Sequence, residues 1–254
     1  MTIPRIYSPA ALEKEKFCRL GPDNHKYLKH ILRLEPGSRI TIFDGFGHEF
    51  AAVIKSYAAD SVNVELAEKI EAAGKEIKIT LSQALPKANK MDVIVRNAAE
   101  LGADVIIPFT ASRSVSRISG EKIILKTVRW QKIAREAARC CRSLQITDVL
   151  PVDSFEAMLA RAAQQAIKMI FWEEEDQKNI KDVLADPAWM AAKDIFITVG
   201  PEGGFTKDEI ARAKAAGFIS VSLGRQILKV ETAAMAIISI IQYEKGIFST
   251  TCGR

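Results

Sequence analysis

The feature that most constrains the fold is an apolar run that opens into a glycine-rich loop and is followed by a helix start. Residues 195–199 are Ile-Phe-Ile-Thr-Val, and Gly-Pro-Glu-Gly-Gly-Phe follows directly. A short, continuous apolar run is typical of a strand buried in a parallel sheet. Thr206-Lys-Asp-Glu209 has the pattern of a capping box, which predicts the first turn of a helix. This order predicts a parallel α/β sheet with a ligand loop at the carboxyl end of a strand.

A second glycine-containing loop, residues 224–231, follows a predicted strand at 219–223. It leads into a predicted helix over 232–244, with Thr232 as the expected N-cap. The two loops match neither the dinucleotide fingerprint nor the phosphate-binding P-loop. The pattern alone leaves two interpretations open, which are a ligand site at two adjacent strand ends and a pair of ordinary tight turns.

The hydrophobic periodicity changes near residue 75 and divides the chain into two expected domains, 1–72 and 73–254. In the first, alternating runs between turn residues predict a small β-barrel or sheet with strands at 39–43, 49–54 and 61–66. In the second, strand alternates with helix, which predicts a mostly parallel α/β sheet. Its further strands are expected at 77–81, 105–109, 167–171 and 194–199, and its further helices at 91–101, 122–141, 154–165 and 206–216. The acidic stretch 173–186 is expected to be an exposed loop or short helix.

Composition restricts the class of protein and is compatible with a polyanionic partner without requiring one. The 254 residues carry a net charge of +5, and residues 1–72 are neutral, so the whole excess lies in the second domain. The four cysteines form no CxxC pair, which argues against a disulfide scaffold or a zinc site. The N-terminus lacks an apolar segment, and no apolar run approaches the about 20 residues of a membrane span. These features predict a reduced, cytoplasmic protein without a metal.

Several short motifs, in one order along nearly the whole chain, resemble the ribosomal RNA small-subunit methyltransferase E family. The C-terminal ones are the glycine loop 199–205, Ser222-Leu-Gly224, Ile227-Leu228 and Glu231-Thr-Ala233. The others are Leu85-Pro-Lys87, Met91-Asp92, Glu100-Leu-Gly102, Ile107-Pro108, Arg113-Ser-Val115, Arg129-Trp-Gln-Lys132, His30-Ile-Leu-Arg33 and Pro36-Gly37.

The resemblance implies a SPOUT-class fold, in which a mostly parallel, trefoil-knotted sheet has helices on both faces and follows a PUA-like RNA-binding β-barrel. It also implies a homodimer that transfers a methyl group from S-adenosylmethionine to N3 of a uridine in 16S ribosomal RNA of the small subunit. Periodicity alone would favour an ordinary doubly wound sheet, because knots are rare.

The resemblance implies that the glycine loops hold the cofactor, since the donor side of methyl transfer needs mainly shape and orientation. The expected cofactor-binding residues are Trp172, Val199, Gly200, Pro201, Glu202, Gly203, Gly204, Ser222, Leu223, Gly224, Ile227 and Leu228. Trp172 could instead be a packing residue, and Glu202 could simply shape its loop.

The acceptor nitrogen of uracil must lose a proton, so a general base or a cation that stabilises the anion is expected. Arg113 and Glu231 are the expected catalytic residues. Arg113 could instead bind a phosphate or form a structural ion pair. Glu231, like Glu100, could cap or pair structurally. All histidines lie in the first domain, so an imidazole base requires that domain to reach the site.

A basic helix is the expected contact with the RNA backbone. The helical period places Lys132, Arg135, Arg139 and Arg142 opposite Trp130, Ala134, Ala137 and Cys141. With the family motifs, the expected RNA-binding residues are His30, Arg33, Arg129, Lys132, Arg135, Arg139 and Arg142. A charged helix face can instead be merely solvated, and His30 and Arg33 could stabilise the barrel.

Two segments depart from the family pattern. Where the family has Gln, a small residue, Gly and Arg, this chain has Arg139-Cys-Cys-Arg-Ser143, and Arg142 would match the family arginine only after a shift. The family sequence Leu-Arg-Thr-Glu-Thr-Ala is Leu228-Lys-Val-Glu-Thr-Ala233 here, which loses a guanidinium fork and a hydroxyl. The alternatives are therefore a non-catalytic RNA-binding or ribosome-assembly factor, and a SPOUT methyltransferase for another RNA.

Overall fold

A computed structural model describes residues 3–10, 12, 15–70, 77–115, 120–164 and 167–246. These residues form two units. One holds the described residues up to 70 together with Ala138–Ile146, and the other holds the described residues of 77–137 and 147–246. The predicted boundary between residues 72 and 73 lies outside the described residues. None of the helices in these ranges is long and apolar enough to cross a membrane.

The first unit is a five-stranded sheet curled around one apolar core. Its strands, in the order β1-β3-β4-β5-β2, are β1 (Arg5–Tyr7), β3 (Arg39–Phe43), β4 (Glu49–Tyr57), β5 (Val62–Ile70) and β2 (Phe17–Leu20). Alternate residues of every strand, with Leu28, belong to a single buried cluster. Leu28 comes from the helical segment formed by α1 (Pro22–His25) and the π-helical η1 (Lys26–Ile31). The strand pattern predicted β3, β4 and β5 but missed the short β1 and β2 and this helical segment.

The second unit is built on a seven-stranded sheet in which every pairing is parallel. The order is β12 (Ile219–Val221), β10 (Ile167–Phe171), β11 (Asp194–Val199), β6 (Lys78–Ala84), β7 (Val105–Thr110) and β8 (Asp148–Val149), and β9 (Asp153–Ser154) also pairs with β7. The prediction of a mostly parallel α/β sheet is confirmed.

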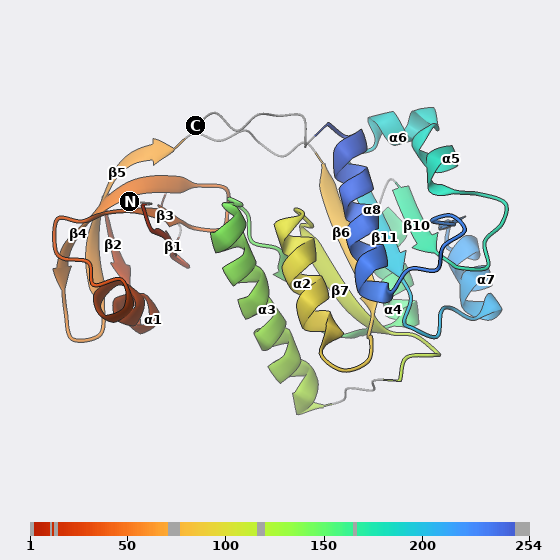
Figure 1. The fold of residues 1–254 in the computed structure, drawn as a ribbon, viewed down its shortest axis with the longest axis horizontal. Helices are drawn as coiled ribbons and strands as arrows, with labels where there is room; N and C mark the ends of the chain where they lie inside the picture. The colour runs from red at the N-terminus through yellow and green to blue at the C-terminus, as the bar shows by residue number, and fades with distance from the viewer. Residues whose placement is uncertain are drawn as a thin grey trace. The chain divides into compact units, whose positions relative to one another are not determined.

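Alternate residues of the strands point to opposite faces of this sheet and pack into two separate cores. Helices therefore cover both faces. One core joins the sheet to α2 (Lys90–Glu100), α3 (Glu121–Cys141), α5 (Ile180–Leu184), α6 (Pro187–Ala191) and α8 (Val230–Glu244). The other joins the opposite face to α4 (Phe155–Arg161) and α7 (Lys207–Ala215). Figure 1 shows α2 and α8 side by side across the first of these faces. The trefoil knot stays a prediction.

Several helix ends differ from the sequence expectation. The helix α8 begins at Val230 with Lys229 as N-cap, so Thr232 lies inside the first turn and is not the cap. The burial of Val230 in the core explains the earlier start. The helix expected over 154–165 ends at Arg161 and continues as a 3-10 turn to Gln164, and residue 165 lies outside the described residues. Cys141, expected on the buried face of α3, is exposed at its end.

The loop after β11 passes close to the side chain of Glu173 at Gly204. Gly204 has φ +67°, a left-handed conformation that L side chains rarely adopt. A Cβ atom built on Gly204 would lie 1.7 Å from Oε1 of Glu173, which follows β10. The capping box predicted for the following helix is confirmed, because the Thr206 and Glu209 side chains each accept from the backbone N–H of the other. The backbone of this loop therefore passes close to the loop after β10. It then enters α7 with the backbone N–H groups of Thr206 and Glu209 both hydrogen-bonded.

Gly204→Ala is expected to lower the free energy of unfolding by about 1–2 kcal/mol, because an L side chain is strained at φ +67°. The exposed carboxylate of Glu173 is the end of a flexible side chain and should move aside at little further cost. The double variant Gly204→Ala, Glu173→Ala should therefore lose nearly as much stability, relative to Glu173→Ala, as Gly204→Ala loses relative to wild type. Urea denaturation measures all of these variants, and a large recovery of stability in the double variant would contradict the dominant role of the backbone.

Candidate functional site

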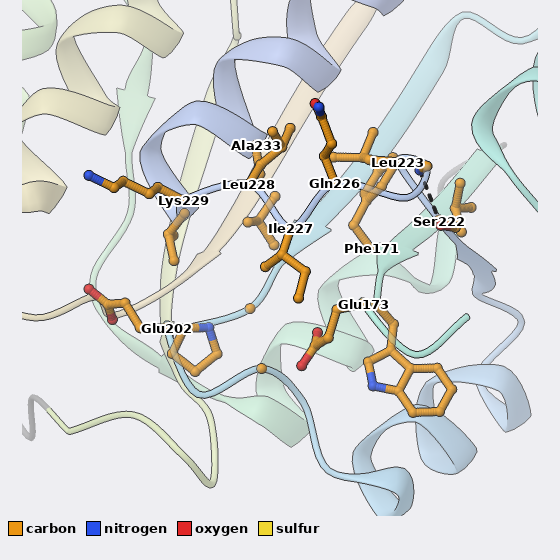
Figure 2. Close-up of a pocket in the computed structure, with 18 of the residues that line it drawn as sticks. Phe171, Glu173, Glu202, Ser222, Leu223, Gln226, Ile227, Leu228, Lys229 and Ala233 are labelled. Carbon is orange, nitrogen blue, oxygen red and sulfur yellow. Dashed lines mark hydrogen bonds between the residues drawn. The ribbon is translucent and has the colours of Figure 1, made fainter. Parts of the chain in front are cut away.

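A cavity of about 470 Å³ lies where three neighbouring strands end. Phe171, the last residue of β10, pairs with Val199 of β11 on one side and with Val221 of β12 on the other. The three loops therefore leave the sheet at one level, and the cavity lies among them (Figure 2). Its volume is within the about 300–1,000 Å³ typical of sites for small organic ligands and cofactors.

All twelve residues predicted to bind a cofactor line this cavity. In the view of Figure 2 the side chains of Leu223, Ile227 and Leu228 lie above the carboxylates of Glu173 and Glu202. The cavity thus has an apolar side and an acidic side. The other residues that line the cavity were not predicted to bind a cofactor. They are Lys90, Phe171, Glu173, Val221, Arg225, Gln226, Lys229, Val230 and Ala233.

Lys90, the first residue of α2, links two of the elements around the cavity. Its Nζ atom lies 3.0 Å from Oε1 of Glu202 and 3.5 Å from Oε2 of Glu231. The hydrogen bond to Glu202 raises the pKa of Lys90 above its ordinary value. Burial alone would raise the pKa of Glu202, but the hydrogen bond from Lys90 and backbone N–H donors hold it below its usual range. The pair is therefore charged at neutral pH, and Glu202 is a poor proton acceptor.

The segment before α3 is attached to the glycine loop from its other side. Nη1 of Arg113 donates to the carbonyl oxygens of Gly203, at 2.9 Å, and Phe205, at 3.4 Å. The backbone N–H of Ser112 donates to Oε1 of the fully buried Glu209, at 2.8 Å. Arg113 thus holds the loop through hydrogen bonds to backbone carbonyls, a contact that differs from both the phosphate contact and the structural ion pair considered from the sequence. Its predicted catalytic role stays a prediction.

Two buried polar atoms beside the cavity lack a hydrogen-bond partner among the described residues. One is Nε1 of Trp172, a donor, and the other is Oε2 of Glu231, an acceptor whose contact with Lys90 is the long ion pair of 3.5 Å. Buried polar groups are normally satisfied, so these two atoms are candidates for contact with a bound molecule. Within the described ranges, no group of three or more His, Cys, Asp and Glu side chains is placed to hold a metal ion.

Of the predicted RNA-binding residues in the second unit, Arg129 already has a protein partner. Its guanidinium donates to Oδ2 of Asp92 at 2.7 and 3.1 Å, and the Trp130 indole donates to the other oxygen at 3.1 Å. The hydrogen bond to Asp92 raises the pKa of Arg129. Arg129 therefore joins α3 to α2. Lys132 is exposed and Arg135 is half-buried.

The other four predicted RNA-binding residues belong to the first unit. His30 is exposed, with its ring edge-on to His25, and Arg33 is exposed with φ 54°. Arg139 is half-buried and lies 5.4 Å from the ring centre of Tyr27. Arg142 is exposed with φ 62°. This left-handed backbone is one that glycine adopts more readily than arginine.

Known proteins resemble this chain along nearly its whole length. Residues 73–242 match the family described as RNA methyltransferase domain, and residues 20–67 match the RNA methyltransferase PUA domain. The ribosomal RNA small subunit methyltransferase E of Bacillus subtilis is 30% identical over 91% of each chain. The enzyme of the same name from Buchnera aphidicola is 28% identical over 97% of this chain and 95% of its own.

A crystal structure of ribosomal RNA small subunit methyltransferase E from Neisseria gonorrhoeae, bound to S-adenosyl methionine, has the same fold. It superposes with a TM-score of 0.84 at 28% identity, covering 95% of this chain and 98% of that one. Both units of this chain therefore have counterparts in that structure. This chain belongs to the ribosomal RNA small subunit methyltransferase E family.

Proposed function

We propose that this protein transfers a methyl group from S-adenosylmethionine to N3 of a uridine in 16S ribosomal RNA of the small subunit, as a cytoplasmic homodimer. The observation that carries the proposal is the cavity enclosed by three loops at one edge of the sheet. A relative with the same fold has S-adenosyl methionine bound. The uridine, its N3 atom and the dimer come from the family resemblance.

The cavity has the properties that this cofactor requires. It is large enough, its apolar side offers Leu223, Ile227 and Leu228, and its glycine loop exposes backbone groups. The unpartnered indole N–H of Trp172 adds a donor. The carboxylate of Glu173 provides negative charge for a cationic ligand, whereas that of Glu202 is paired with Lys90. When bound, S-adenosylmethionine supplies an activated methyl group on a sulfonium, and these residues orient it.

Proton removal from the uracil ring is assigned to the groups at the start of α8. Glu231 lies in the first turn of this helix, and its Oε2 atom lies 3.5 Å from Nζ of Lys90. We propose Glu231 as the proton acceptor. Arg113, anchored through Nη1, would present the rest of its exposed guanidinium to the base or to a phosphate.

Incubation with S-adenosylmethionine and small ribosomal subunits from a strain lacking the gene is expected to produce 3-methyluridine in 16S RNA. Mass spectrometry of the digested nucleosides measures the product, and a reaction without S-adenosylmethionine is the control. A methyl group on a different nucleoside, or on another RNA only, would refute the proposed acceptor. Failure of the purified protein to bind S-adenosylmethionine would favour a non-catalytic RNA-binding factor.

Lys90→Met is expected to weaken S-adenosylmethionine binding about tenfold, because a charge-assisted hydrogen bond no longer ties the glycine loop to α2 and α8. Isothermal titration calorimetry measures the dissociation constant. Lys90→Arg should retain most of the affinity because it keeps the charge. Lys87→Met is the matched control, since Lys87 contacts Glu202 through its backbone N–H and this contact remains. Equal affinities of Lys90→Met and Lys87→Met would contradict this role.

A further inference from the structure

One turn of the first unit presents an aromatic side chain to solvent on a firmly held backbone. Phe46, between β3 and β4, is 68% exposed. Asp44, which is buried, accepts hydrogen bonds from the backbone N–H of Phe46 at 2.8 Å and of His48 at 3.2 Å, and its other oxygen lies 2.8 Å from Nδ1 of His48. Burial opposes ionisation of Asp44, but these bonds hold its pKa below the ordinary value. The charged carboxylate therefore keeps the turn in one conformation at neutral pH.

The segment 142–146 pairs with this turn and carries a basic side chain. Phe46 forms an antiparallel bridge with Gln145, the N–H of Gly47 donates to Leu144 O at 3.2 Å, and the N–H of Ile146 donates to Gly45 O at 3.3 Å. All of these residues belong to the first unit. The turn and the segment thus form one surface rather than two independent loops.

A buried arginine holds the same segment from its other end. The guanidinium of Arg5 donates to Ala138 O at 2.9 Å and to Ser143 O at 2.8 Å, and pairs with Glu49 at 2.5 Å. It also stacks 3.7 Å from the ring centre of Phe43. Residues 138 and 143 are therefore both held by Arg5, and Arg142 lies between them, three residues before the partner of Phe46.

The contacts of the described residues give the Arg142 side chain no role in stabilising the fold. Its side chain is exposed and makes no hydrogen bond or ion pair with the described residues. Its φ of 62° is one that a glycine would adopt with less strain. Arg139, by contrast, lies over the ring of Tyr27. Arg142 is therefore a strained, exposed cation on the segment that pairs with the turn of Phe46.

We propose that Phe46 and Arg142 form a contact site for unpaired RNA, in which an unstacked base lies on the Phe46 ring and Arg142 binds a neighbouring phosphate. Proteins recognise single-stranded RNA by stacking bases on aromatic side chains and pairing the backbone with cations. Phe46 lies within residues 20–67, which match an RNA methyltransferase PUA domain. The choice of RNA as the partner rests on the proposed function.

Phe46→Ala is expected to weaken binding of a fluorescein-labelled single-stranded RNA 12-mer about tenfold, as measured by fluorescence anisotropy. Phe46→Tyr should restore the affinity because its ring also stacks. Phe17→Ala, which removes another exposed ring of the same unit (59% exposed), is the matched control and should leave the affinity unchanged. Binding of a duplex of the same length should respond little to Phe46→Ala.

Arg142→Gly tests the cation without disturbing the backbone, because glycine adopts this φ readily. We expect weaker binding of the 12-mer, a salt dependence reduced by about one phosphate contact, and a denaturation midpoint that does not fall. A loss of RNA affinity together with a lower midpoint would instead indicate a structural role for Arg142 and would overturn its part of the proposal.

Methylation of small subunits separates failure of this site from failure of the proposed function. If wild-type protein forms 3-methyluridine and Phe46→Ala lowers kcat/KM while S-adenosylmethionine affinity is unchanged, the site is supported. If wild type is active and Phe46→Ala matches Phe17→Ala in both assays, the site is overturned and the proposed function stands. If wild type forms no methylated nucleoside, the proposed function fails, whereas the anisotropy series still decides whether Phe46 contacts RNA.

Discussion

The candidate site depends on the register of three parallel strands. Phe171 pairs with both Val199 and Val221, so the loops that follow these residues begin at one level of the sheet. A slip of one residue in either pairing would turn the buried side chains to the wrong face, and both faces are covered by helices. The core therefore enforces the register, and the register brings together loops from three separate parts of the chain.

A glycine-rich loop is conformationally free unless other groups restrain it. Here the restraints come from outside the loop. Arg113 donates to the Gly203 carbonyl, the Lys87 N–H and the Lys90 ammonium donate to Glu202, and the Glu173 carboxylate lies against Gly204. A site whose backbone is held in place before a ligand arrives has less conformational entropy to lose on binding. The charged groups around the cavity thus act on loop shape as well as on the ligand.

The elements that could be predicted from the sequence are those whose signal is local. The strands at 39–43, 167–171 and 194–199 have the predicted bounds, because each is a short apolar or alternating run beside turn residues. The ion pairs of Lys90 and Arg129 could not be predicted in this way, because in each pair the carboxylate comes from a part of the chain that only the fold brings near. The prediction of Thr232 as N-cap was wrong, because burial of Val230 makes the helix begin two residues earlier. Tertiary packing here outweighs the local preference for a threonine cap.

The two departures from the family pattern have different physical meanings in this structure. Val230 is 7% exposed and packs in the core, where a hydroxyl would need a partner, so valine suits this position. Lys229 is exposed and lines the cavity, so its charge remains available to a ligand. In the other departure, Arg142 does not suit its position, because it adopts a glycine-like conformation at a cost of about 1–2 kcal/mol. It makes no stabilising contact with the described residues. Residues in sparsely populated backbone conformations cluster at functional sites. The conformation of Arg142 therefore supports the RNA contact proposed for it, whereas Arg129 of α3 already binds Asp92.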